Sequence, residues 1–468
     1  MSLYKFDFPK GGKVIEGKTK ALYEVLDYPG LLIAEYKSDI TAFDDPRFTT
    51  VFGTKARDSN AVTCRIFELL QQAGLPVAYL GKLSETEFVA PRVQMAPVEL
   101  ITRRFVHPKG SIRKRRPELP PHYRFGELTF EVCLKTHNGG KYTNIFGAEV
   151  DLALPRVDDK PTDDPMVLNP LADEWKLIGK SPLYDPEVIA TVKRDEVLHG
   201  VDEITEYRRL LHAAFLIIEA FFKLIGWTTY DLKVECGRLK EDFQPEVGPL
   251  LKAGTIVIAD VIDHDSWRVL DESGREMSKQ VFRDMILAGK LDQDEIAQIY
   301  SSVVRAVENF RVQEQALVLW RGSEDDNFPD LQLNGSMGRL DLNNLPGIKV
   351  ERITGSGHKQ TIACLDRLNA LQARYKYGAI IVEVGRSNGL GPTLAAHTIW
   401  PVISRPASLE KCPGDIWSNL RCPSNDPMAT IIDKGNAVLF ALRQLAPLNP
   451  YVAAWLQYGV EQLEATPV

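Results

Sequence analysis

Residues 255–268, TIVIADVIDHDSWR, join a buried strand to a cluster of charged side chains. Residues 256–259 form an unbroken apolar run, which is typical of a strand covered on both faces. Asp260, Asp263 and Asp265 follow, and the stretch closes on Arg268. Carboxylates and an arginine placed together at the end of a buried strand indicate a metal site beside an anion site.

The stretch just upstream supplies a second strand. Residues 230–235, YDLKVE, alternate strictly, so Asp231, Lys233 and Glu235 share one face. A loop rich in Gly, Pro and charge follows, and we predict a hairpin that brings Glu235 opposite Asp260. Two carboxylates and a lysine suit a magnesium nucleotide, because Mg²⁺ is typically held by one or two carboxylates plus phosphate oxygens. A surface hairpin closed by a salt bridge has the same spacing, so both interpretations stay open here.

Composition excludes several classes of protein. The 468 residues suffice for two or three domains of ordinary globular composition, and a net charge of -7 argues against a general nucleic-acid binder. The six cysteines include no CxxC pair, which predicts reduced thiols in a cytoplasmic protein. The N-terminus does not read as a signal peptide. His212, Glu219 and Lys223 interrupt the longest apolar stretch, residues 210–225, which favours a core helix over a membrane span.

Two basic segments invite anionic ligands. Residues 16–20, EGKTK, form the polar tip of a predicted hairpin, where glycine and lysines can fold over a triphosphate. Residues 103–115, RRFVHPKGSIRKR, are the densest basic patch and suit a phosphate on a small substrate. Each also has a plainer interpretation: a solvated turn in the first case, and a loop matched to acidic surface in the second.

The remaining chain predicts an inserted segment and a second domain. From Lys135 to about Trp175 the chain is polar and rich in Pro and Gly, which indicates an inserted loop or lid. After a connecting helix, strand-like runs at 316–320, 348–353 and 378–384 alternate with a helix at 361–375. This pattern predicts a doubly wound parallel sheet, whose ligands bind at the carboxyl ends of the strands. Polar loops follow all three runs.

The motifs of the first part resemble SAICAR synthetase, a ligase of purine biosynthesis that joins aspartate to the carboxylate of CAIR using ATP. They are EGKTK (16–20), SETEF (84–88), the RR…GS patch (103–111), DP (164–165), DLKVECG (231–237), IADVIDHDSWR (258–268) and KQVFRD (279–284). The resemblance implies that ATP is bound by Lys18, Thr19, Lys20 and Lys233, Mg²⁺ by Glu235 and Asp260, and the ribotide phosphate by Arg104, Ser111 and Arg268. It implies that Lys135, Asp164, Asp39 and Arg283 surround the reacting carboxylate and the aspartate.

The polar loops of the second part resemble AIR carboxylase, which is fused to SAICAR synthetase in animals. They read RGSEDD (321–326), SGHK (356–359) and GRSNGLGP (385–392). In that family the imidazole carbon of AIR attacks CO₂ with neither biotin nor metal. The resemblance implies that His358 moves the ring proton and that Lys359 and Ser387 hold CO₂. The implied substrate-binding residues are Ser323, Asp326, Ser356, Arg386, Asn388 and Gly389.

Together these resemblances predict an α+β ligase domain (1–290), a connecting helix (291–314) and an α/β carboxylase domain with a parallel sheet (315–468). They imply phosphoribosyl-aminoimidazole, L-aspartate and CO₂ as substrates, ATP and Mg²⁺ as cofactors, and a cytoplasmic homo-oligomer, by resemblance an octamer. Neither a nucleic-acid nor a membrane partner is expected.

Several positions depart from the family pattern. Ala42-Phe43-Asp44 has a bulky ring where glycine is usual, Asp325 replaces a phosphate-binding serine, and Glu383 falls in a normally apolar strand. These departures leave a second hypothesis open. It is a divergent ATP-dependent carboxylate–amine ligase of specialised metabolism, acting on another substrate, with a weak or inactive carboxylase half as an oligomerisation scaffold.

Overall fold

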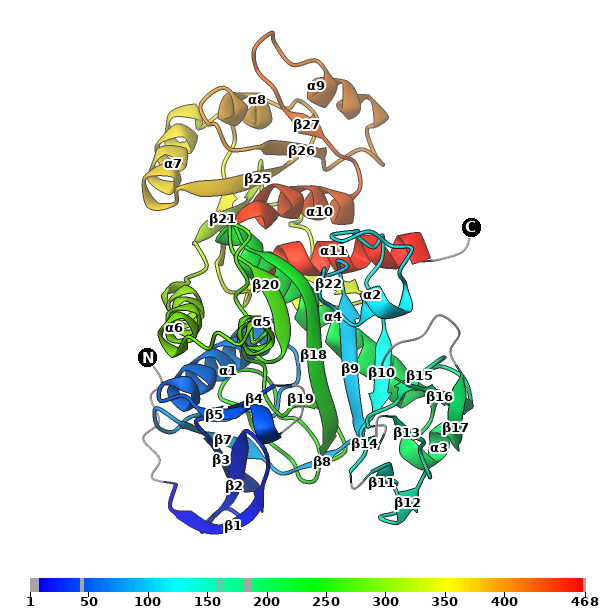
Figure 1. Cartoon of the computed structure of the whole chain (residues 1–468). Helices are drawn as coiled ribbons and strands as arrows, with labels where there is room; N and C mark the ends of the chain where they lie inside the picture. The colour runs from blue at the N-terminus through cyan, green and yellow to red at the C-terminus, as the bar shows by residue number, and fades with distance from the viewer. Residues whose placement is uncertain are drawn as a thin grey trace. The chain divides into compact units, whose positions relative to one another are not determined.

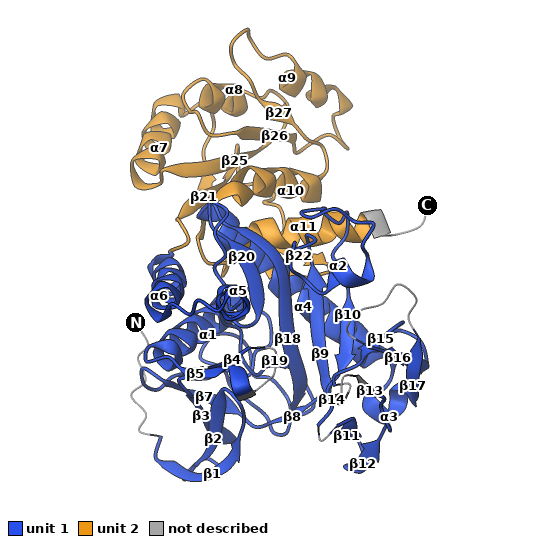
Figure 2. Ribbon diagram, in the orientation of Figure 1, with its two compact units in different colours: residues 1–310 blue, residues 311–468 orange. Residues whose placement is uncertain are grey.

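The computed structural model describes residues 8–42, 46–137, 139–157, 160–161, 163–179 and 187–465. Phe43 and Asp44 lie outside these ranges. The chain divides into two compact units, residues 1–310 and 311–468 (Figure 2). The helix expected to connect two domains is α6 (Gln293–Asn309), which belongs to the first unit.

The first unit begins with a small antiparallel sheet in the order β1-β2-β3-β7-β6. Its strands are β1 (Lys10–Glu16), β2 (Lys20–Val25), β3 (Leu31–Tyr36), β7 (Glu87–Pro91) and β6 (Gly81–Lys82). The EGKTK turn joins β1 to β2, as predicted. Helix α1 (Lys55–Gln72) packs against β3, β7 and α6, and β4 (Asp39–Thr41) pairs with β5 (Thr49–Val51).

A nine-stranded sheet forms the rest of the unit around β18 (Thr228–Leu239), its long central strand (Figure 1). Four strands pair with β18, all antiparallel: β8 (Val93–Met95), β9 (Val98–Arg103), β19 (Ile256–Ala259) and β20 (Trp267–Leu270). Helix α4 (Val201–Leu224) buries its apolar face against β18 and β9. The sheet continues from β9 through β10 (Glu131–Leu134).

The predicted β18–β19 hairpin is present, with a register one residue away from the expected one. Glu235 lies opposite Ala259, and Asp260 is the first residue after β19. Asp260 has a positive φ of 64°, so the chain turns sharply at this carboxylate.

The prediction of an inserted loop or lid from Lys135 to about Trp175 is wrong in part, because this region contains strands. The nine-stranded sheet gains β15 (Met166–Val167), β16 (Glu174–Ile178) and β17 (Val188–Lys193), because Trp175 and Leu177 are fully buried on one face of β16. Two short hairpins precede them: β11 (Lys141–Thr143) with β12 (Glu149–Asp151), and β13 (Arg156–Val157) with β14 (Lys160–Pro161). Alternation within such short strands is too brief to stand out in sequence.

The second unit contains the predicted parallel sheet, in the order β24-β21-β25-β26-β27. Every pair in it is parallel. Its strands are β21 (Gln315–Arg321), β24 (Ile348–Thr354), β25 (Tyr377–Val384), β26 (Val402–Pro406) and β27 (Ala429–Thr430). Alternate residues of β21 and β25 pack with α7 (Thr361–Arg374) and α8 (Leu390–Ala395) in one apolar cluster, whereas α10 (Lys434–Leu445) also contacts β25.

Shorter elements complete both units: α2 (Ile112–Arg115), α3 (Arg194–Val197), α5 (Gln280–Ala288), α9 (Ile416–Leu420), α11 (Pro450–Ala465) and the hairpin of β22 (Gln332–Gly335) and β23 (Gly338–Asp341). Within the described residues, every helix is too short or too polar to span a lipid bilayer.

Candidate functional site

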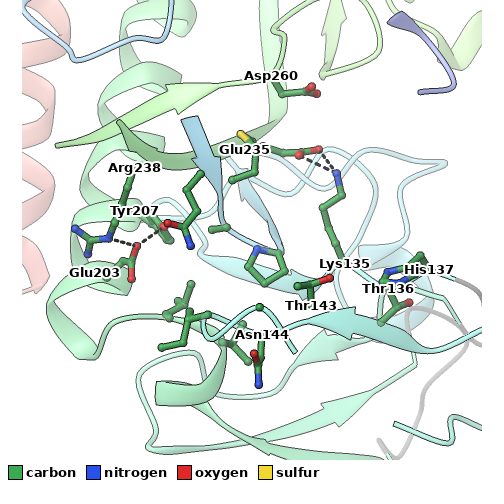
Figure 3. Close-up of a pocket in the computed structure, with 18 of the residues that line it drawn as sticks. Lys135, Thr136, His137, Thr143, Asn144, Glu203, Tyr207, Glu235, Arg238 and Asp260 are labelled. Carbon is green, nitrogen blue, oxygen red and sulfur yellow. Dashed lines mark hydrogen bonds and ion pairs between the residues drawn. The ribbon is translucent and has the colours of Figure 1, made fainter. Parts of the chain in front are cut away.

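A cavity of about 600 Å³ in the first unit is lined by both predicted metal ligands and by one of the four predicted ATP-binding residues, Lys20 (Figure 3). Its lining comes from the β1–β2 turn, from residues 94–97 at the end of β8 and just after it, from β18 and from the region after β10. Lys20, Lys135, Glu235 and Asp260 all line it. A cavity of this size is ordinary for a small-molecule ligand.

The charged end of the cavity joins carboxylates to lysines. Lys135 Nζ lies 2.9 Å and 2.8 Å from the two oxygens of Glu235, and Lys20 binds Asp260. Lys233 Nζ lies 3.1 Å from Glu99 and 3.5 Å from Glu235. Asp231 and Glu235 are both buried and Lys233 contacts Glu235, as expected for one face of β18.

The two predicted metal ligands have opposite pKa shifts. Burial, followed by the charge of Asp260, raises the pKa of Glu235. Burial acts the same way on Asp260, but the Lys20 charge and hydrogen bond outweigh it and lower the pKa of Asp260. Two carboxylates close enough to compete for ionisation attract a divalent cation. A pair of carboxylates is a donor set that suits Mg²⁺, which takes its further oxygens from phosphate and water.

Lys18 and Thr19 occupy the turn before Lys20. Lys18 is exposed, and the Thr19 carbonyl accepts a hydrogen bond from the backbone N–H of Lys37 at 2.8 Å. Gly17 lines the cavity, so the turn borders it as the sequence predicts.

A second charged cluster lies around Asp231, nearer the start of β18. Asp231 accepts hydrogen bonds from Arg103 at 2.8 Å and from Arg268 at 2.7 Å. Arg103 also lies 3.4 Å from the hydroxyl of Ser111 and 2.9 Å from both oxygens of Glu131. The structure therefore brings Ser111 and Arg268 to one place, as the sequence suggested, but with Arg103 between them.

Arg104 lies elsewhere. It is almost fully buried, and its guanidinium donates to the two oxygens of Glu219 on α4 at 2.9 Å and 3.2 Å. Neighbours along an extended segment point to opposite sides. Arg103 consequently faces Ser111, and Arg104 faces the helix.

Of the other predicted ligase residues, Asp164 lies near the cavity, whereas Asp39 and Arg283 do not line it. Asp164 accepts a hydrogen bond from the backbone N–H of Thr136 at 2.8 Å. Thr136 directly follows Lys135, so Asp164 lies near the backbone of Lys135. Asp39 lies on β4, 3.6 Å from Lys37, and Arg283 lies on α5. Neither Asp39 nor Arg283 is among the residues that line the cavity.

Sequence reasoning missed the far end of the cavity. Glu203 accepts hydrogen bonds from Tyr207 at 2.6 Å and from Arg238 at 3.0 Å, and all three line the cavity (Figure 3). Glu203 and Tyr207 are four residues apart on α4, so their side chains lie on the same face of the helix. The contact with Arg238 is long-range, and nothing in the local sequence indicates it.

In the second unit, the three polar loops meet at the carboxyl ends of β21, β24 and β25. A Cβ on Gly357 would lie 2.5 Å from Cα of Leu390, and one on Gly389 would lie 2.4 Å from Cε1 of His358. The SGHK and GRSNGLGP loops therefore touch through glycines, with the exposed His358 ring against Gly389. Ser387 Oγ lies 3.5 Å from Nε2 of His358.

The RGSEDD loop places the carboxylate of Asp326 beside the GRSNGLGP loop. The backbone N–H of Ser323 donates to Asp326 at 3.1 Å, and a Cβ on Gly385 would lie 3.8 Å from Oδ1 of Asp326. Burial, and to a lesser degree the charge of Asp325, raises the pKa of Asp326. Asp325 itself is exposed, and its backbone N–H donates to Ser323 Oγ at 3.2 Å.

The remaining predicted carboxylase residues shape the loops. Asn388 is buried and bonds Ser404 at 2.8 Å and Asn419 at 2.9 Å, so it holds its loop against β26. The Arg386 backbone N–H donates to Asp415 at 2.6 Å. Ser356 Oγ accepts from the backbone N–H of Lys359 at 3.3 Å within the SGHK turn.

Comparisons with known proteins identify the families that the two parts of the chain resemble. The model of the family SAICAR synthetase matches residues 13–158 and 183–299, and that of AIR carboxylase matches residues 340–465. The chain is 28% identical to a probable multifunctional protein ADE2 of Caenorhabditis elegans, over 93% of this chain and 90% of that protein. It is 30% identical to the bifunctional phosphoribosylaminoimidazole carboxylase/phosphoribosylaminoimidazole succinocarboxamide synthetase of Rattus norvegicus, over 97% and 94% respectively.

Among solved structures, a phosphoribosylaminoimidazole-succinocarboxamide synthase from Ehrlichia chaffeensis is 17% identical, with a TM-score of 0.45, and covers 64% of this chain and 99% of that one. The SAICAR synthetase match alone spans more than half of the chain, and the rat relative aligns along nearly all of it. The chain therefore belongs to the SAICAR synthetase family, as a bifunctional member that also carries an AIR carboxylase domain.

Proposed function

We propose that this chain performs two reactions of purine biosynthesis. Its second unit carboxylates aminoimidazole ribonucleotide (AIR) to CAIR, and its first unit joins CAIR to L-aspartate with ATP. The observation that carries the proposal is the cavity in which Lys20, Lys135, Glu235 and Asp260 meet, in a chain whose relatives carry both names. We further propose that the protein works with Mg²⁺, as a homo-oligomer in the cytoplasm.

The ligase unit has to activate a carboxylate, which is a poor electrophile. Phosphorylation by ATP makes it reactive, and the amine of aspartate then displaces phosphate. Lys20, Lys135 and Lys233 would neutralise the phosphates, and Mg²⁺ on Glu235 and Asp260 would supply further charge neutralisation. The pKa of Lys135 is raised: burial alone would lower it, but Glu235 outweighs burial. Lys135 thus stays protonated and suits charge neutralisation better than proton abstraction.

The ribotide phosphate would lie between Arg103, Ser111 and Arg268. A planar guanidinium binds phosphate through two parallel hydrogen bonds. Two arginines sharing the carboxylate of Asp231 are held in fixed positions. We assign this role to Arg103 in place of Arg104.

The carboxylase unit would bind AIR across its three loops. His358, exposed beside Ser387 and Gly389, is placed to take the ring proton after the imidazole carbon attacks CO₂. Lys359 and Ser387 would hold CO₂, and Ser323, Asp326 and Ser356 would hold the ribotide.

The test supplies the full chain with ATP, Mg²⁺, aspartate and CAIR, or with AIR plus bicarbonate, and identifies products by mass. Asp260→Asn should abolish ligation with the fold intact, because it removes a charge directed at the metal. Asp271→Asn, on the turn after β20, is the matched control. Normal ligation by Asp260→Asn at ordinary Mg²⁺ would contradict the metal assignment, and failure of the wild-type chain in both assays would refute the proposed function.

A further inference from the structure

One wall of the cavity is built by the region expected to be a loop or lid. The hairpin of β11 and β12, residues 141–151, is called the outer hairpin here. Its tip contributes Thr143, Asn144, Ile145 and Gly147 to the lining, and Val197 and Leu198 at the end of α3 continue it. The SAICAR synthetase match breaks off at residue 158, shortly after this hairpin, and resumes at residue 183.

The tip of the outer hairpin is held in one conformation. Asn144 Oδ1 accepts hydrogen bonds from the backbone N–H groups of Phe146 at 3.0 Å and Ala148 at 2.9 Å. The Ile145 N–H donates to the carbonyl of Glu196 on α3 at 3.1 Å. The backbone at Ile145 is therefore held by hydrogen bonds without a ligand, which lowers the entropy cost of binding against this segment.

Two apolar side chains that line this cavity are exposed to solvent. Ile15 is 59% exposed and Met95 is 40% exposed, and both line the same cavity as Ile145. Exposed apolar side chains inside a concave site mark the place of an apolar ligand group. Because the same cavity contains lysines and a carboxylate pair suited to a cation, the ligand that fits it has an apolar part and a polyanionic part.

We propose that the outer hairpin forms one wall of the nucleotide pocket, in which Ile145 packs on the base of ATP together with Ile15 and Met95. This inference rests on the proposed ligase function and goes beyond it, since it assigns base binding to the hairpin at residues 141–151. The triphosphate then extends toward Lys20 and Glu235. Nucleotide affinity depends on a segment that performs no chemistry.

The test measures binding to the full-length protein by calorimetry in the presence of Mg²⁺, with two probes. One is a non-hydrolysable ATP analogue, and the other is inorganic tripolyphosphate, which lacks a base. Ile145→Ser should weaken the analogue about tenfold, as expected for one buried aliphatic contact, and leave tripolyphosphate unchanged. Lys20→Ala should weaken both probes. Phe146→Ser, at the adjacent 76% exposed position outside the lining, should change neither.

Unchanged binding of the analogue to Ile145→Ser, or equal loss of both probes, would overturn the inference. If that variant does not fold, Ile145→Val replaces it, with an expected loss of about twofold for the analogue alone; no loss would again overturn the inference. A wild-type chain that binds neither probe would overturn the proposed function, so the two failures are distinguishable.

Discussion

Arg103 and Arg104 are adjacent and chemically identical, yet they have different surroundings. Both are buried and paired with acids: Arg103 binds Glu131 and Asp231 and also contacts Ser111, whereas Arg104 binds Glu219 on α4. Arg103→Lys keeps the charge and loses the planar, two-point geometry, so the KM for CAIR should rise about tenfold or more while the KM for ATP stays unchanged. Steady-state kinetics with each substrate varied in turn provide the measurement.

Arg104→Lys is the control for this prediction. Its contact with Glu219 is within the fold, so it should lower stability and leave both KM values near their normal level. A larger rise in the KM for CAIR in Arg104→Lys than in Arg103→Lys would reverse the assignment.

Glu383 is an acid inside the parallel sheet. It is fully buried on β25 and pairs with Arg405 on β26 at 3.1 Å, and its Oε1 has no hydrogen-bond partner among the described residues. Burial raises its pKa to about 7, although Arg405 opposes the shift. Between its ordinary value of 4.5 and about 7 the folded chain holds a proton that the unfolded chain has released. The contribution of Glu383 to the free energy of unfolding is therefore greatest below pH 4.5 and falls as the pH rises to 7.

Glu383→Gln cannot ionise. Its stability relative to the wild type should rise by roughly 2–3 kcal/mol between pH 4.5 and 7 and then level off. Hydrogen exchange of β25 peptides, measured at several pH values in both proteins, reports this difference. A difference that does not change with pH would show that Glu383 does not titrate in this range.

At the scale of helices and strands, features with a local sequence signal were predictable, and features that depend on pairing with distant strands were not. The β18–β19 hairpin and the parallel sheet were predictable, because continuous apolar runs and polar strand ends are local signals. Neither the one-residue register offset at Asp260 nor the choice of Arg103 over Arg104 has a local signal, since each depends on pairing with distant strands. The contact between Arg238 and Glu203 was hidden for the same reason.

The contact between two loops of the second unit gives a prediction at this scale. Gly389→Ala would place a methyl group 2.4 Å from Cε1 and 2.6 Å from Nε2 of His358, so the ring has to move. Carboxylation of AIR should fall at least tenfold, because a shift of about 1 Å in a reacting group can cost a hundredfold in rate. Ligation of CAIR should stay normal.

Gly459→Ala, on α11, is the matched control, because a methyl group there would meet nothing within 4 Å. Product analysis of both variants with AIR plus bicarbonate decides the matter. Full carboxylation by Gly389→Ala would show that the His358 position is not critical.

For the whole molecule, two compact units imply two separable reactions. His358→Asn should abolish carboxylation and leave ligation intact, whereas Asp260→Asn should do the reverse. Equal amounts of the two variants, mixed with AIR, bicarbonate, ATP, Mg²⁺ and aspartate, should then form the final product that neither forms alone. Loss of ligation in a folded His358→Asn variant would contradict this independence.

Strand β18 also limits the size of acceptable substrates. Asp231, which holds the arginines, and Glu235, at the proposed metal site, are four residues apart on it, or about 13 Å at 3.3 Å per residue. Partners on both edges prevent this strand from stretching. Under the proposed assignment, an imidazole acid without its sugar phosphate would be too short to engage both ends at once, so the chain would select its acid by length before any chemistry begins.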